Sequence, residues 1–137
     1  MIPECIETEV LIIGCGVAGG TVALQLADLS IPVAVTTRND RLEKSNTHYA
    51  QGGIVYHGMD DSVEKLSKDL LLSGDKHNNP KAARILAEEG PGLVDEILID
   101  KLGIEFDKND DGTLSLVREG GHQVARILHV ADATGKT

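Results

Sequence analysis

The apolar positions in the first part of the chain change from a strand pattern to a helix pattern and back. Residues 10–13 form a short, continuous apolar run that glycine stops, which predicts a buried parallel strand. Residues 21–29 carry apolar side chains at helical spacing, and residues 33–37 predict a second strand. The first 37 residues therefore predict one β-α-β unit.

Helical spacing dominates the middle of the chain. Residues 54–57 suit a short strand, and Ser62 is a candidate N-cap for a helix whose apolar face includes Leu66 and Leu70. Asn79-Pro80 opens another helix, because proline is favoured in a first turn. The Gly-Pro-Gly run at 90–92 is expected to interrupt that helix before the apolar pattern resumes.

The last third reads as a hairpin followed by a polar tail. Residues 104–107 and 113–117 flank an Asn-Asp-Asp-Gly turn at 109–112, which predicts a β-hairpin. Residues 118–137 carry no predicted closing element. The fold class is α/β: a Rossmann-like parallel sheet with flanking helices and a β-hairpin.

Composition restricts the class of partner. The 137 residues suffice for one domain, and a net charge of −9 disfavours a nucleic-acid partner. No apolar run reaches transmembrane length, and the two cysteines do not indicate a secreted disulfide scaffold. We therefore expect a cytoplasmic protein without a membrane partner.

A glycine motif follows the first strand and opens the first helix. Gly14-x-Gly16-x-x-Gly19 in this context is typical of a dinucleotide pyrophosphate site. Its glycines allow a tight turn, close approach of the phosphates and close helix–strand packing, while the helix N-terminus attracts the phosphates. The alternative is a strand–helix turn that binds nothing.

The end of the second strand lacks the acid that holds a ribose hydroxyl in NAD sites. Thr36, Thr37 and Arg38 stand there instead, and Asp40 lies beyond the strand. This departure argues against a plain NAD-dependent dehydrogenase. Hydroxyl and basic side chains suit a site beside adenosine phosphates.

Two polar clusters resemble metal sites only in part. Residues 107–112 match the first half of a calcium loop, but its twelfth position is Arg118 in place of a glutamate, so we expect a hairpin turn. His122 and His129 lack zinc-ligand spacing, and we expect no metal. Residues 118–129 fit either a pocket for an anionic substrate or a solvated turn. In such a pocket Arg126 and the histidines, His122 and His129, are available to carboxylates and Glu119 to a cation.

Three segments together resemble the N-terminal part of the L-aspartate oxidase family. They are residues 10–19, residues 45–54 with the sequence Ser-Asn-Thr-His-Tyr-Ala-Gln-Gly-Gly-Ile, and residues 118–135 with Arg-Glu-Gly-Gly-His at the start. This family is grouped with the flavoprotein subunits of succinate dehydrogenase and fumarate reductase. The second and third segments are the more specific ones.

The resemblance implies an FAD site and assigns residues to it. The residues that it places at the phosphate turn are Gly14, Gly16, Val17, Ala18 and Gly19. It places Arg38 near the adenosine. The residues that it places in the loop around the flavin are Asn46, Thr47, Ala50, Gln51, Gly52 and Gly53. Glu119 is expected to orient the substrate amino group, with His122 and Arg126 as supports.

The resemblance also implies a reaction. In this family FAD oxidises L-aspartate to iminoaspartate, dioxygen or fumarate reoxidises the flavin, and the product passes to quinolinate synthase in NAD biosynthesis. Residues 1–137 correspond to the N-terminal part of the FAD-binding domain. The capping domain, the helical C-terminal domain and the catalytic arginine fall outside the chain, so we expect the 137 residues alone to be inactive and to self-associate through exposed apolar surface.

Two other functions are open at this point. One is a fumarate reductase or succinate dehydrogenase flavoprotein subunit acting on another dicarboxylate, for which His48 is a candidate for covalent flavin attachment. The other is a non-catalytic nucleotide-binding module. The Glu119 segment favours the amino-acid oxidase.

Overall fold

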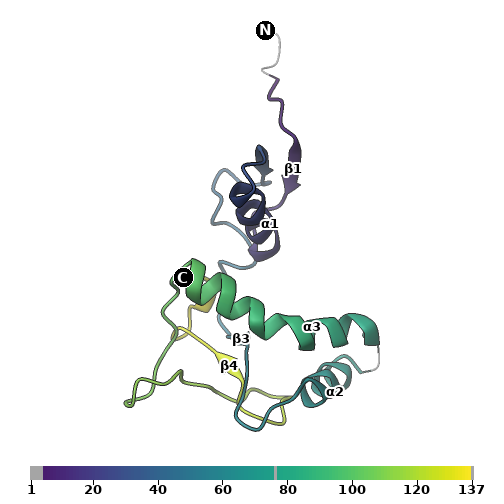
Figure 1. Cartoon of the computed structure of the whole chain (residues 1–137), viewed down its shortest axis with the longest axis vertical. Coiled ribbons are helices and arrows are strands. Elements are labelled where there is room, and N and C mark those ends of the chain that lie inside the picture. The colour runs from purple at the N-terminus through teal and green to yellow at the C-terminus, as the bar shows by residue number, and fades with distance from the viewer. Residues whose placement is uncertain (1–4, 76, 137) are drawn as a thin grey trace. The chain divides into compact units, whose positions relative to one another are not determined.

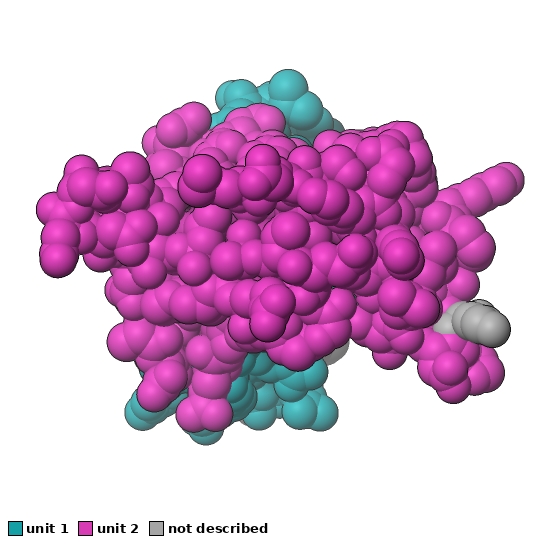
Figure 2. Space-filling view, turned by 90° about the horizontal axis from the view of Figure 1, so that it is seen from below, with its two compact units in different colours: residues 1–50, 136 teal, residues 51–135, 137 magenta. Residues whose placement is uncertain are grey.

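The chain forms two compact units. The computed structural model describes residues 5–75 and 77–136 (Figure 1), and the units are residues 1–50 with 136 and residues 51–135 with 137 (Figure 2). The α/β class is confirmed: the first unit holds a parallel strand pair with a helix, and the second holds helices with an antiparallel strand pair. No described helix is long and apolar enough to cross a membrane.

The first unit is the predicted β-α-β unit. Strand β1 (Val10–Ile13) leads through the glycine turn to helix α1 (Val17–Asp28), and strand β2 (Val33–Thr36) returns parallel to β1. The helix begins four residues earlier than the prediction. Gly19 therefore lies inside the first helical turn, where a Cβ atom would sit 2.1 Å from the carbonyl oxygen of Gly14.

The prediction that β1 is buried is wrong for one of its faces. Ile12 is buried, and its side chain lies close to Gly19 of α1, so this face is covered by the helix. Leu11 and Ile13 point to the opposite face and are 59% and 83% exposed. The reason is that the described residues of this unit include one helix, which covers one side of a two-stranded sheet.

The second unit joins two helices to a short strand pair. Strand β3 (Ile54–Val55) pairs antiparallel with β4 (Ile127–Leu128), and helix α2 (Val63–Ser73) packs on helix α3 (Pro80–Leu93). The chain ends in a short 3₁₀ helix, η2 (Thr134–Lys136). Strand β4 was not predicted, because Ile127 and Leu128 lie in a stretch of mixed apolar and polar residues without the alternation of a strand.

Both predicted helix starts in this unit are confirmed. The Ser62 hydroxyl accepts a hydrogen bond from the backbone N–H of Lys65, at 3.2 Å. The Asn79 side-chain oxygen accepts from the N–H groups of Lys81 and Ala82, and Pro80 occupies the first turn of α3. These caps satisfy N–H groups that have no partner inside the helix.

The expected interruption at residues 90–92 is wrong. Helix α3 runs through Pro91 and continues as a π-helical segment, η1 (Val94–Lys101). The cause is a continuous buried stripe along one side of both elements, which comprises Ala83, Ala87, Pro91, Val94 and Ile97. Burial of this stripe outweighs the hydrogen bond that Pro91 cannot donate.

The hairpin prediction is confirmed at its turn only. The Asn109 N–H donates to the carbonyl oxygen of Thr113 at 2.8 Å, and strand pairing is limited to the bridge between Lys108 and Leu114. Asp111 accepts hydrogen bonds from the backbone and hydroxyl of Thr113, so this carboxylate serves the turn. The Asp107 carbonyl still accepts from the Ser115 N–H of the opposite arm at 2.8 Å, but the Asp107 N–H donates to the His129 carbonyl, and Val117 bridges Ile127.

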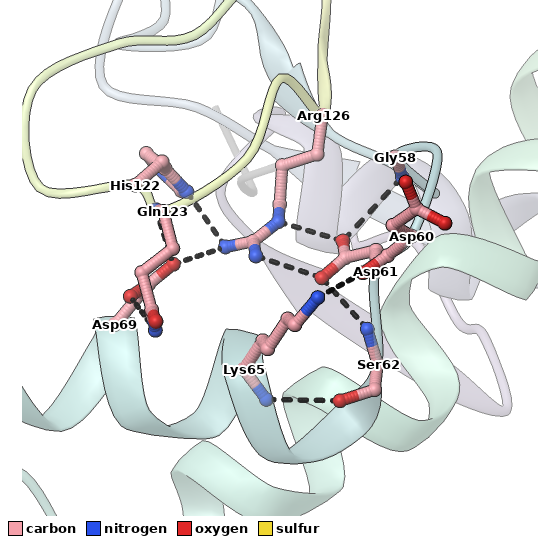
Figure 3. A network of polar contacts seen from close by, with 9 residues as sticks. All are labelled: Gly58, Asp60, Asp61, Ser62, Lys65, Asp69, His122, Gln123 and Arg126. Atoms are coloured by element: carbon pink, nitrogen blue, oxygen red, sulfur yellow. Dashed lines mark hydrogen bonds and ion pairs between the residues drawn. The ribbon is translucent and has the colours of Figure 1, made fainter.

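A buried arginine holds the C-terminal segment against α2. Arg126 is fully buried, and its guanidinium donates from Nε and Nη2 to the two carboxylate oxygens of Asp61, each at 2.7 Å (Figure 3). Its Nη1 donates to Asp69 at 2.7 Å. Asp69 also accepts from the backbone and side-chain amides of Gln123. Since Asp61 lies just before α2 and Asp69 lies within it, one guanidinium joins the start and the middle of α2 to the segment at residues 122–126.

His122 completes this cluster with a defined tautomer. Its Nδ1 lies 3.0 Å from Nη1 of Arg126. Because a guanidinium only donates, Nδ1 must be the accepting nitrogen, and the proton of the neutral imidazole is on Nε2.

The cluster changes the acidity of its members. Burial disfavours the charged forms of Asp61 and Asp69, but hydrogen bonds from Arg126 and from neighbouring N–H groups outweigh it and lower the pKa of both carboxyls. For Arg126 burial also opposes charge, and the two carboxylates raise its pKa above the usual value. All three groups are therefore ionised at neutral pH.

We predict that acid destabilises the second unit through this cluster. The folded pKa of each aspartate lies below its unfolded value of about 4, so their contribution is complete above that pH and is lost as pH falls through the folded pKa. Asp69→Asn should lower the free energy of unfolding by about 3 kcal/mol at neutral pH and flatten its decrease below about pH 4. Urea unfolding at several pH values measures this, with the exposed Asp110→Asn as control. Equal pH dependence in all three proteins would contradict it.

Candidate functional site

The first unit contains a cavity of about 820 Å³ at the carboxyl ends of its parallel strands. Its walls are the glycine turn after β1, the residues after β2 and the first part of the predicted flavin loop. The lining residues are 13–16, 36–39, 44–47 and Tyr49. Ligands of parallel α/β sheets bind at this edge, so the cavity lies where the glycine motif predicts a nucleotide.

The glycine turn has the geometry that close approach of a phosphate requires. Gly14 has φ +110°, a conformation that side chains disfavour, and its N–H donates to the carbonyl oxygen of Thr36 at 2.8 Å. Helix α1 begins immediately after Gly16, and the N–H groups of Ala18 and Gly19 have no carbonyl partner within the helix. They supply hydrogen-bond donors and the positive end of the helix dipole.

Thr47 caps this helix from a distant part of the chain. Its hydroxyl accepts a hydrogen bond of 3.0 Å from the N–H of Val17. A Cβ atom at Gly16 would lie 3.2 Å from the same oxygen, so a side chain at residue 16 would crowd this contact between the loop and the turn. The sequence predicts Thr47 beside the flavin and gives no direct sign of its capping role. The available signals were the hydroxyl of Thr47 and a glycine at the N-cap position, which has no side chain to cap the helix itself.

Basic and hydroxyl side chains replace the ribose acid, as the sequence indicated. Thr36, Thr37 and Arg38 all line the cavity, together with Lys44. Lys44 forms an exposed ion pair with Asp40 at 3.1 Å, so Asp40 contributes to the rim as the partner of a cation. The cavity thus combines a helix N-terminus with two cations, a donor set that fits the pyrophosphate of FAD.

The predicted cofactor residues divide between the two units. Gly14, Gly16, Arg38, Asn46 and Thr47 line the first cavity. Val17, Ala18 and Gly19 form the first turn of α1 beside it. Gln51, Gly52 and Gly53 belong to the second unit, and Ala50 lines neither cavity.

A second cavity, of about 360 Å³, lies within the second unit, and we call it the Glu119 pocket. The end of the flavin loop, residues 51–53, forms one part of its lining. Val117, Glu119 and residues of the 129–132 segment form the rest. The Glu119 carboxylate lies over Gly52, with Oε1 3.5 Å from the position that a Cβ atom would occupy there. The structure therefore brings together the backbone of the flavin loop and the acid assigned to the substrate amino group.

The surroundings of the loop explain its glycines. A Cβ atom at Gly53 would lie 2.1 Å from the carbonyl oxygen of Leu128, so the loop crosses β4 at backbone contact. Leu128 is fully buried. Any side chain at residue 53 would separate the loop from the strand beneath it.

Neither His122 nor Arg126 lines the Glu119 pocket. The expectation that Arg126 is available to substrate carboxylates is wrong, because its guanidinium is buried and bound to Asp61 and Asp69. Both residues act on the pocket indirectly, since the His122 N–H donates to the Glu119 carbonyl and Arg126 fixes the segment after it. The sequence signal for this role was Asp69, an acid on the apolar side of α2 beside Leu66 and Leu70.

Several curated relatives carry the name L-aspartate oxidase. The chain is 42% identical over 127 residues to a chloroplastic L-aspartate oxidase of Arabidopsis thaliana, which covers 91% of this chain and 19% of that protein. It is 41% identical to L-aspartate oxidase of Clostridium acetobutylicum, over 96% of this chain and 29% of that protein. L-aspartate oxidase of Halobacterium salinarum is 38% identical, over 96% of this chain and 25% of that protein. The chain thus spans less than a third of the length of these relatives.

Solved structures of related flavoproteins share the fold. The chain superposes on a subunit of the Mycobacterium smegmatis Sdh1 complex with a TM-score of 0.84 and 32% identity, over 94% of this chain and 22% of that one. Quinol fumarate reductase of E. coli superposes with a TM-score of 0.82 and 24% identity, over 96% of this chain and 22% of that one. At this identity the likeness is evidence for a shared fold only.

A family assignment completes these comparisons. Residues 9–137 match the family described as FAD binding domain, a region that includes both cavities. The fold, the glycine turn at residues 14–19 and this match agree on FAD as the cofactor. The chain belongs to the family of FAD-binding domains.

Proposed function

We propose that this chain is part of an L-aspartate oxidase, in which FAD oxidises L-aspartate to iminoaspartate with dioxygen or fumarate as electron acceptor. Relatives named L-aspartate oxidase, about 40% identical over most of the chain, support the proposal. In this role the oxidation is the first step of de novo NAD biosynthesis, and its product passes to quinolinate synthase.

One observation carries the proposal: a carboxylate stands beside the flavin loop. Glu119 and residues 51–53 line the same pocket, and Glu119 Oε1 lies over Gly52. A carboxylate next to the cofactor binds a substrate ammonium through charge-assisted hydrogen bonds. A plain dicarboxylate offers no such group, so the pocket suits an amino acid.

The roles of the residues follow from their places. The turn at residues 14–19, Arg38 and the loop at 46–53 hold the cofactor, which when bound accepts two electrons from the substrate. Glu119 orients the amino end of L-aspartate so that Cα faces the cofactor. The residues that line the Glu119 pocket include no Lys or Arg. The substrate carboxylates therefore bind to groups outside this pocket, and we propose that the 137 residues alone have no turnover.

A succinate dehydrogenase or fumarate reductase flavoprotein subunit is the second candidate, favoured by the TM-score of 0.84. Its distinguishing feature is covalent flavin at a histidine, for which His48 is available in the loop. Acid precipitation of the FAD-loaded protein separates the two: the L-aspartate oxidase releases its flavin into the supernatant. Flavin that stays in the pellet favours the second candidate. A non-catalytic nucleotide-binding module would release flavin but would never be reduced by substrate.

We predict that Thr47→Val weakens FAD binding about fivefold, since one hydrogen bond contributes about 1 kcal/mol. The substitution keeps the shape of the side chain but removes the oxygen that accepts from Val17 N–H. Flavin fluorescence titration of the apoprotein measures the dissociation constant. Thr21→Val, within α1, is the matched control. Equal affinities in the two variants would show that the Thr47 cap does not shape the cofactor site.

We predict that Glu119→Gln raises the KM for L-aspartate about tenfold, because the amide loses the charge that pairs with the ammonium. The dissociation constant of succinate, which lacks an amino group, should change less than about twofold. Steady-state kinetics and succinate titration of the bound flavin spectrum provide both values, and both are measured on the full-length enzyme of which we propose this chain is part. A matching loss for succinate would refute the assignment of Glu119 to the amino group.

We also propose that the 137-residue chain self-associates through the bare face of β1. Leu11 and Ile13 are 59% and 83% exposed there, and apolar patches of this kind drive association. Light scattering should show a concentration-dependent mass that Leu11→Gln reduces. A monodisperse monomer at all concentrations would rule this out.

A further inference from the structure

The segment that carries Glu119 is fixed at its base, but the Glu119 side chain is not. The Val117 N–H donates to the Ile127 carbonyl at 3.0 Å, and the Val117 carbonyl accepts from the Arg126 N–H at 3.1 Å. Glu119, two residues further along, is exposed, and its carboxylate forms no hydrogen bond or ion pair with the residues that the structure describes. The position of this carboxylate therefore depends on the backbone that carries it.

That backbone forms a turn against the C-terminal end of α2. The His122 N–H donates to the Glu119 carbonyl at 3.3 Å, and Gly121 has φ +86°, the conformation that the third residue of a type II turn requires. A Cβ atom at Gly121 would lie 2.8 Å from Oγ of Ser73, the last residue of α2. The turn at residues 119–122 thus lies directly on the helix.

Gln123, the next residue, uses two donors on one carboxylate. Its backbone N–H donates to Oδ2 of Asp69 at 2.9 Å, and its side-chain Nε2 donates to Oδ1 at 2.7 Å (Figure 3). We call these two bonds the Gln123 clamp. Asp69 is 2% exposed and is also bound by Arg126, whereas Gln123 is an exposed residue that burial does not hold in place.

The clamp and the turn use the same side of α2. Asp69 and Ser73 are four residues apart, so they lie on one face of the helix. This face contacts the segment at Gly121 and again at Gln123. The segment is therefore fixed on both sides of Glu119, by Val117 before it and by Gln123 after it.

We propose that Gln123 is a positioning residue that acts through Glu119. The clamp holds the turn on α2, and in that position Oε1 of Glu119 lies over Gly52 of the flavin loop. Without the side-chain bond to Asp69, Glu119 occupies this position for only part of the time. The inference rests on the proposed function, because it takes Glu119 as the group that binds the substrate ammonium.

This role affects substrate binding and leaves the chemical step unchanged. A protein that holds its binding-competent arrangement for a fraction of the time binds its ligand more weakly by that fraction. Once L-aspartate is bound, it meets the same residues, so kcat stays the same. Succinate has no amino group for Glu119 to bind, so its affinity does not depend on the clamp.

Gln123→Met tests the clamp, because methionine has a similar length but no donor for Asp69. The protein is the full-length, FAD-loaded enzyme of which we propose this chain is part. The KM for L-aspartate should rise about fivefold, while kcat and the dissociation constant of succinate change less than about twofold.

Two further variants separate the loss of this bond from other effects. Gln123→Lys, whose ammonium group can donate to Asp69, should restore the KM to within about twofold of wild type. Gln25→Met, the same substitution at an exposed residue of α1, is the matched control and should leave the KM unchanged.

A double substitution shows whether Gln123 acts through Glu119. In enzyme that already carries Glu119→Gln, the change Gln123→Met should raise the KM no further, because the group that the clamp positions is gone. A general loosening of the second unit would instead add its full effect to that of Glu119→Gln.

Hydrogen exchange of the backbone amides at residues 119–123 measures the clamp without turnover. Exchange should be faster in Gln123→Met and close to wild type in Gln123→Lys. Unchanged exchange or an unchanged KM in Gln123→Met, an equal loss for succinate, or additive effects in the double substitution would each overturn the inference and leave the proposed function intact. Wild-type enzyme that L-aspartate never reduces would overturn the proposed function, and this inference with it.

Discussion

The second unit depends on one buried guanidinium. Arg126 has no exposed surface, and its three side-chain nitrogens donate to Asp61 shortly before α2, to Asp69 within α2 and to the imidazole of His122. A buried charge without partners would be prohibitively costly, so these contacts must form together. They fix the strand that follows, since Ile127 and Leu128 pair with β3 and Ile127 bridges Val117. The Glu119 pocket is built on that framework.

The cofactor site of the first unit depends instead on missing side chains. Gly14 supplies a conformation with positive φ, Gly19 allows contact between helix and strand, and Gly16 makes room for the Thr47 hydroxyl. A loop thirty residues away in sequence can then cap α1. Each unit thus contains its own cavity: the first has the glycine turn and two cations in its lining, and the second has an acid beside residues 51–53.

The features that depend on residues close together in the sequence were predicted from its local patterns. The β-α-β unit, the caps at Ser62 and Asn79 and the glycine turn follow from short-range rules, and the structure has them all. Features that depend on contacts between residues far apart in the sequence could not be predicted from local patterns. Helix α3 continues past its glycines because Pro91 is buried, and β4 forms by pairing with β3. Arg126 can be buried because Asp61 and Asp69, far from it in the sequence, neutralise its charge. The resemblance located Glu119, but the pocket around it required the fold.

We propose that the enzyme of which this chain is part oxidises an amino acid at the carbon beside its ammonium group. Anaerobic mixing of that full-length, FAD-loaded enzyme with L-aspartate, followed by the visible absorbance of the flavin, tests this most directly. We expect L-aspartate to bleach the flavin and succinate to leave it oxidised. Bleaching by succinate, or no bleaching by either compound, would contradict it.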